Sequence, residues 1–112
     1  MLWAKLTRLA ALALATTAAD APLGDVRTEA EAVSAEVAAV AAAEGAAIDP
    51  AAVLGELRGL PDDASSSLRA DVTGGRTDHE LDAIGGAVLR AAARHGLDVP
   101  RTAALVARIG TL

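Results

Sequence analysis

A shortage of large side chains limits the folds open to this chain. Apolar residues make up 53% of its 112 residues, yet Trp3 is the only aromatic and much of the remainder is alanine. Alanine buries little area, so close approach of helices, rather than interlocking of bulky side chains, has to hold the core together. No stretch alternates polar and apolar residues as a strand would. The sequence therefore predicts an all-α fold.

Glycine and proline divide the chain into helical segments of one domain, residues 1–112. Gly45 and Gly96 are expected as left-handed caps, and Asp49 precedes a proline that opens a helix. These signals predict a compact multi-helix bundle of about five to six helices. The expected helices cover residues 2–19, about 28–44, 50 to about 58, 65–73, 79–95, and a last one from 100.

Finer features of these helices also follow from the pattern. Thr28 and Glu31 have the form of a capping box, and Asp78 is positioned to cap the fifth helix. Gly85 and Gly86 are tolerable inside that helix if another backbone approaches closely. The second helix should bury Val33, Val37 and Val40, and its residues expected to face water are Glu29, Glu36 and Glu44.

Composition excludes several classes of function. The absence of cysteine excludes disulfides and thiolate chemistry, and it agrees with a reducing, cytoplasmic setting. A net charge of -5, with single scattered arginines and no stacking aromatics beside them, argues against a nucleic-acid partner. His79 and His95 lack metal-ligand spacing, so no metal site is predicted.

The N-terminal segment has a second interpretation. Lys5 and Arg8, an apolar run, and then Ala19-Asp20-Ala21 form a passable secretory signal over residues 1–21. The apolar run is short and diluted by alanine, and Trp3 lies where a signal should be simply basic. The segment is too short to span a bilayer. An exported alanine-rich helical protein therefore stays open as an alternative.

Polar residues gather between residues 65 and 86, where an alanine-rich bundle does not need them for folding. Each has an ordinary structural explanation: Ser65 could cap a helix, Asp82 could pair with Arg76 at the surface, and Lys5 could extend from its apolar helix into solvent. Spacing alone yields no nucleophile, base and orienting acid. The other candidate residues in this stretch are Ser66, Ser67, His79 and Glu80.

The ordered set of motifs resembles the C-terminal helical domain of ketopantoate reductases (2-dehydropantoate 2-reductases). The motifs cover nearly the whole chain in the family's order and spacing. They are Trp3-Ala4-Lys5-Leu6, Ala21-Pro22-Leu23-Gly24, the segment 36–45, Ser66-Ser67-Leu68-Arg69-Ala70-Asp71, Glu80-Leu81-Asp82-Ala83-Ile84-Gly85-Gly86, Arg94-His95-Gly96 and Val99-Pro100.

This resemblance implies a cytoplasmic, NADPH-dependent reduction of a 2-oxo acid, as in pantothenate biosynthesis. It implies a Rossmann-type domain that holds the nucleotide, with substrate in the cleft between domains. No G-x-G-x-x-G after a strand occurs in this chain, so the expected unit is the substrate-binding and dimerisation domain alone, without a nucleotide site and inactive by itself.

The resemblance also implies roles for individual residues. Lys5 matches the lysine that donates a proton or hydrogen bond to the keto oxygen, where an ammonium held among apolar side chains would stabilise developing negative charge. Glu80 matches the acid that orients this lysine and the substrate, and Ser67 matches a residue that binds the substrate end. Asp82 and Arg76 match structural members of the same motif.

The chain departs from the family pattern at several positions. Leu9, Ala13 and Leu23 stand where the family commonly has substrate-binding asparagines, and the chain has no asparagine or glutamine at all. The segment between Arg76 and Glu80 is one residue longer than in the family pattern. A divergent reductase with another substrate, a domain that has lost catalysis, and a non-enzymatic module for self-association or partner binding are therefore the alternatives.

Overall fold

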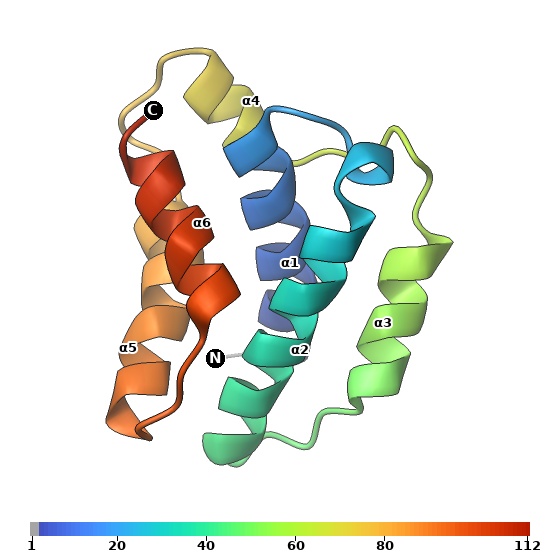
Figure 1. Ribbon diagram of the computed structural model, residues 1–112, viewed down its shortest axis with the longest axis vertical. Coiled ribbons are helices and arrows are strands. Elements are labelled where there is room, and N and C mark those ends of the chain that lie inside the picture. Colours follow the sequence, from blue (N-terminus) through green and yellow to red (C-terminus); the bar gives the residue numbers. More distant parts are fainter. Residues whose placement is uncertain (1–2) are drawn as a thin grey trace.

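The computed structural model describes residues 3–112, and these form helices joined by short turns, with no strand among them (Figure 1). The all-α bundle is confirmed. The α-helices of this part of the chain are α1 (Trp3–Ala19), α2 (Arg27–Ala43), α3 (Pro50–Gly59), α4 (Ser67–Thr73), α5 (Ala87–Arg94) and α6 (Pro100–Gly110); η1 (Leu23–Asp25) is a 3₁₀ turn and η2 (Asp82–Gly86) a π-helical turn. The predicted helix start at Leu2 lies outside the described residues.

Helix α1 is the centre of the bundle. It packs against α2, α3, α4, α6 and η2, and Figure 1 shows it between α6 on one side and α3 on the other. Ala10, Ala11 and Leu14 are fully buried, because no charged residue follows Arg8 until the helix has ended. Cleavage after Ala21 would remove this central helix, which argues against the secretory interpretation. The described helices include none that is long and apolar enough to cross a bilayer.

The core is built from small side chains, as the composition predicts. Val33, Val37 and Val40 form the buried stripe of α2 and are fully buried, which confirms the predicted spacing. Burial of each valine stabilises the fold by roughly 1.5–3 kcal/mol. Gly85 lies where α1 and α6 come close. A Cβ there would lie 2.5 Å from a methyl group of Val106, so a neighbouring side chain, rather than the expected backbone, requires the glycine.

Local signals at several helix ends are confirmed. The Asp49 carboxylate accepts a hydrogen bond from the Ala51 N–H at 3.0 Å, and Pro50 occupies the first turn of α3. Gly45 and Gly96 adopt left-handed conformations, with φ of 87° and 64°, after α2 and α5. Glycine populates this region without the steric cost that a Cβ brings.

Two predicted N-terminal caps are wrong. Helix α2 begins at Arg27, directly after the η1 turn. Its first helical hydrogen bond runs from the Ala30 N–H to the Val26 carbonyl at 2.9 Å, so Val26 occupies the N-cap position. Thr28 therefore lies inside the helix and cannot act as its cap. Asp78 does not cap the fifth helix either, since helical structure begins only at Leu81, whose N–H donates to the His79 ring at 3.4 Å.

Glu29, Glu36 and Glu44 do not face open water as expected. Each is only partly exposed and binds the C-terminal part of the bundle, because α5 and α6 pack alongside α2. Glu36 makes the densest set of contacts: its carboxylate accepts from two backbone N–H groups at the start of α6. The pairs are Glu29 with Arg101, Glu36 with Arg101 and Thr102, and Glu44 with Arg94 and His95.

Candidate functional site

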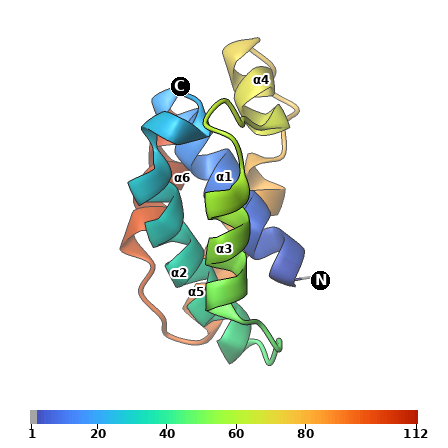
Figure 2. The same ribbon diagram turned by 90° about the vertical axis from the view of Figure 1, so that its right-hand side faces the viewer.

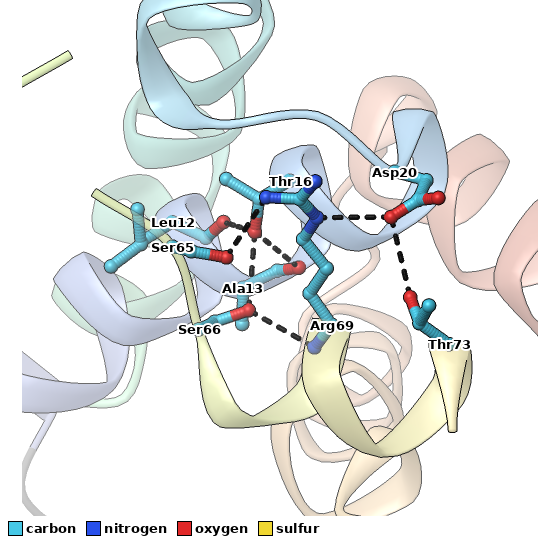
Figure 3. A network of polar contacts seen from close by, with 8 residues as sticks. All are labelled: Leu12, Ala13, Thr16, Asp20, Ser65, Ser66, Arg69 and Thr73. Carbon is cyan, nitrogen blue, oxygen red and sulfur yellow. Dashed lines mark hydrogen bonds and ion pairs between the residues drawn. The ribbon is translucent and has the colours of Figure 1, made fainter. Parts of the chain in front are cut away.

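The serine-rich segment folds into the start of α4 and packs on the C-terminal half of α1. Figure 3 shows its anchoring contact, a hydrogen bond of 3.1 Å between the hydroxyls of Thr16 and Ser66. Thr16 donates its single proton to the Leu12 carbonyl at 2.7 Å, so Ser66 must be the donor between the two hydroxyls. Thr16 is fully buried. This hydroxyl pair therefore fixes where α4 meets α1.

Ser66, rather than Ser65, is the N-cap of α4. Its backbone is extended and its hydroxyl accepts from the Arg69 N–H at 3.2 Å. Ser65 instead accepts from the Arg69 guanidinium at 3.2 Å, which corrects the predicted cap by one residue. Ser67 is then the first residue of α4. It is exposed, and its hydroxyl has no hydrogen-bond partner among residues 3–112.

Arg69 ties α4 to the residue that follows α1. Its Nε donates to Asp20 Oδ1 at 3.0 Å, and the Thr73 hydroxyl donates to the same oxygen at 3.2 Å (Figure 3). These hydrogen bonds, first from Arg69 and then from Thr73, lower the pKa of Asp20. Asp20 has a φ of 47°, a left-handed conformation that aspartate tolerates better than most residues. Because Asp20 neutralises Arg69, this corner offers no free cation to a ligand.

Lys5 lies in the first turns of α1 and is exposed. It lines a hollow of about 240 Å³ between α1 and α3, together with Arg8, Asp49 and Glu56. Lys5 thus extends toward solvent, as its ordinary structural explanation predicts, and the start of α3 brings charged side chains as well as apolar ones to this opening. Arg8 Nη1 lies 3.7 Å from Glu56 Oε2, whereas Lys5 has no ion-pair partner within the described part of the chain.

Glu80 is exposed, at the point where the chain enters η2. Its carbonyl accepts from the Ile84 N–H at 2.9 Å, and its carboxylate makes no ion pair with any residue from 3 to 112. The π-helical turn that follows packs against α1, the helix that carries Lys5. Such turns are rare and occur often at functional sites.

Asp82 and Arg76 do not pair with each other. Asp82 Oδ1 accepts from Arg90 Nη1 at 2.9 Å, and Arg76 pairs with Asp71 at 3.5 Å, so the predicted surface pair is wrong. The reason lies in Gly86, one turn beyond Asp82: a Cβ there would collide with the Asp82 carboxylate. The absence of a side chain leaves room for Arg90 to reach back along the helix. Both residues thus have ion-pair partners at the surface, other than the one predicted.

The three candidate residues share one framework without touching. Lys5 stands near the start of α1, α4 with Ser67 packs on the other half of that helix, and Glu80 precedes the turn that packs against it. Figure 2 shows the first turns of α1 and α4 along the same edge of the molecule. No hydrogen bond or ion pair among the described residues joins Lys5, Ser67 and Glu80. Any joint action therefore requires a molecule between them.

Sequence reasoning missed Thr16 and Asp20, which hold α4 in place. A signal for Thr16 was available, because it lies on the same face of the first helix as Lys5, eleven residues away. No residue near Asp20 in the sequence indicates its role, because its partners, Arg69 and Thr73, are about fifty residues away. Within residues 3–112, no three metal-ligating side chains gather into a cation site.

The whole sequence matches one family of protein domains. Residues 1–112 match the family described as "Ketopantoate reductase PanE/ApbA C terminal". No curated protein matches the sequence.

Solved structures have the same fold over nearly the whole chain. A dimeric ketopantoate reductase from Staphylococcus aureus superposes with a TM-score of 0.85 at 21% identity, covering 97% of this chain and 41% of its own. A ketopantoate reductase from Ralstonia eutropha JMP134 gives 0.83 at 28% identity, covering 98% and 39%. D-mandelate dehydrogenase in a complex with NADH and anilino(oxo)acetate gives 0.84 at 20% identity, covering 97% and 49%. The chain thus spans less than half the length of these proteins.

Proposed function

Since the chain belongs to the family of ketopantoate reductase C-terminal domains, we propose that it is the helical, substrate-binding half of a reductase that turns a 2-oxo acid into a 2-hydroxy acid. The nucleotide, NADPH in this proposal, would be held by a Rossmann-type domain outside these residues. The described residues do not fit a dinucleotide: their left-handed glycines, Gly45, Gly75 and Gly96, all follow helix C-termini, whereas a pyrophosphate is bound by a glycine-rich turn before a helix N-terminus.

The observation that carries this proposal is the exposed, unpaired side chain of Lys5 within residues 3–112. Its side chain is exposed and has no ion-pair partner among residues 3–112, although the neighbouring Arg8 is engaged by Glu56. It also projects from the central helix, whose position the whole core fixes. A catalytic cation needs this combination of a rigid origin and an uncommitted charge.

The bound nucleotide would supply a hydride to the keto carbon of the substrate. The Lys5 ammonium then donates a proton to the keto oxygen, where negative charge develops as the hydride arrives, and the product is the 2-hydroxy acid. Glu80, exposed beside α1, would orient the ammonium and the substrate. The free hydroxyl of Ser67 would bind the opposite end of the substrate.

The direct test supplies the missing half. The chain is mixed with, or fused to, a nucleotide-binding domain of a family reductase, and NADPH oxidation is followed with a panel of 2-oxo acids. Lys5→Ala should lower kcat by about 10²–10⁴-fold, the usual contribution of a positioned acid. Arg8→Ala is the matched control, since it removes a cation from the same hollow and should change kcat little. Turnover that ignores Lys5→Ala would contradict the proposed role.

Self-association is a second candidate function, and an apolar hollow on the surface favours it. About 380 Å³ lies open between α1, α2 and α6, lined largely by apolar side chains that include Ala15, Val26 and Leu105. Burial of such a surface against a second copy would remove apolar area from water. Sedimentation velocity of the chain over a range of concentrations tests this: a monomer at every concentration excludes it.

A further inference from the structure

A hollow of about 310 Å³ opens between the end of α6 and the loop that follows α4, which lie next to each other in Figure 1. Within the described part of the chain, it shares no residue with the hollow between α1 and α3. Val72, which is half-buried, and Ile109, which is buried, give it apolar walls, and the loop contributes Arg76 and His79. Ligand sites typically combine apolar walls with a few polar groups, and about 300 Å³ is the small end of their range. The hollow is therefore suited to a small molecule with both kinds of surface.

The imidazole ring of His79 has a free donor, and a contact with the backbone holds the ring. Its Nδ1 accepts a hydrogen bond from the Leu81 N–H at 3.4 Å, just before the π-helical turn. A ring nitrogen that accepts carries no proton, so the neutral ring carries its proton on Nε2. Nε2 donates to no group among residues 3–112, although the ring is only partly exposed. This N–H is therefore available to a ligand in the hollow.

The guanidinium of Arg76 is also available to a ligand. Its Nη1 lies 3.5 Å from Asp71 Oδ1, and the side chain of Arg76 donates no hydrogen bond within residues 3–112. An exposed ion pair of this kind contributes little to stability, so the guanidinium can turn toward a ligand at little cost. Its planar set of donors matches the two oxygens of a carboxylate. No other carboxylate among these residues lies within ion-pairing distance of Arg76 or His79, so both donors suit an added anion.

We propose that this hollow binds a small monocarboxylate with a short hydrocarbon chain. The Arg76 guanidinium and the His79 Nε2–H bind the carboxylate through charge-assisted hydrogen bonds, and the chain lies against Val72 and Ile109. Inorganic phosphate has no apolar part to cover these two side chains, so the walls favour the carboxylate with its chain. The proposal does not depend on the reductase function, because it uses none of the residues around Lys5.

Titration of the chain with isovalerate at constant ionic strength, followed by NMR of the backbone amides, tests the proposal. We expect saturable shifts of the amides around Arg76, His79 and Ile109. Acetate and inorganic phosphate lack the hydrocarbon chain, and isovaleramide lacks the charge, so each should bind at least about tenfold more weakly. Equal affinity for any of these three would overturn the proposal. Saturable shifts confined to the surroundings of Lys5, or none at all, would overturn it as well.

Two variants and a control test the assigned residues. Arg76→Gln should weaken the binding of isovalerate by about tenfold or more. Arg58→Gln is the matched control and should leave Kd unchanged, because Arg58 is about as exposed, also pairs with one carboxylate, and does not line this hollow. His79→Asn keeps an acceptor for the Leu81 N–H but removes Nε2, so it should weaken binding by about threefold to tenfold. An unchanged Kd in either Arg76→Gln or His79→Asn, with thermal unfolding intact, would overturn the assignment.

Discussion

Replacement of Glu36 by alanine should destabilise this bundle far more than its place on the surface of α2 suggests. The carboxylate of Glu36 supplies the N-terminal cap of α6. Oε1 accepts from the Thr102 N–H at 2.7 Å and from its hydroxyl at 2.8 Å, and Oε2 accepts from the Arg101 N–H at 3.0 Å. Val99, which occupies the N-cap position, has no polar side chain to do this. A residue of α2 thus satisfies N–H groups that α6 cannot satisfy itself.

The expected magnitude follows from these contacts. Loss of an N-terminal cap costs about 1 kcal/mol. Thr102 is fully buried, so its unpaired hydroxyl adds a desolvation cost of about 1–3 kcal/mol. Glu36→Ala should therefore lower the free energy of unfolding by about 2–4 kcal/mol. At about 4–8 °C for each kcal/mol in a domain near this size, Tm should fall by roughly 8–30 °C.

Urea unfolding followed by circular dichroism measures this loss. Glu31→Ala is the matched control: Glu31 lies on the same helix, and its partner, Arg58, is exposed, so its pair should contribute less than about 1 kcal/mol. Both variants gain the same helix propensity. In the Thr102→Val background, Glu36→Ala should cost about 1–2 kcal/mol less, since the hydroxyl is already gone. Equal losses in Glu36→Ala and Glu31→Ala would refute the capping role.

The remaining predictions concern packing and pH. Gly85→Ala should lower the free energy of unfolding by about 1–3 kcal/mol, because the added Cβ would lie 2.5 Å from a methyl group of Val106. Gly55 has open space around it, so Gly55→Ala should raise the free energy of unfolding by about 0.5–1 kcal/mol. Equal effects of the two substitutions in urea titrations would contradict this packing. Hydrogen bonds from His95 and then Arg94 lower the pKa of Glu44 below 4.5, so its contribution to stability is complete above that pH and is lost as the pH falls through the lowered value. Glu44→Gln should flatten this acid loss below about pH 4.5, and an unchanged pH dependence would exclude the pair as its source.

Signals confined to a few neighbouring residues could be predicted from the sequence. Asp49 caps α3, and Gly45 and Gly96 end their helices, because each depends only on residues within one turn. The valine stripe of α2 is of the same kind, since periodicity alone sets which face is buried. The choice of Ser66 over Ser65 as cap was not local: it depends on Thr16, fifty residues away.

The candidate site also has a part that the sequence predicts and a part that only the structure decides. Lys5, Ser67 and Glu80 could be proposed from motif order, but their surroundings could not. The charged hollow around Lys5 exists because α3 packs beside α1, and Arg90 rather than Arg76 holds Asp82 because Gly86 leaves the room. Side chains of long reach choose among several partners of similar charge, and only packing decides which one is near.

The sequence by itself determined that this chain is an all-α bundle with a small-residue core, because helical periodicity, glycine and proline act locally and alanine leaves no other way to bury area. The tertiary structure alone decided what the polar residues do. It made Glu36 a cap for a distant helix and bound Arg69 to Asp20, and it left Lys5 uncommitted on the central helix. These outcomes depend on which helices meet, and that depends on the whole core at once.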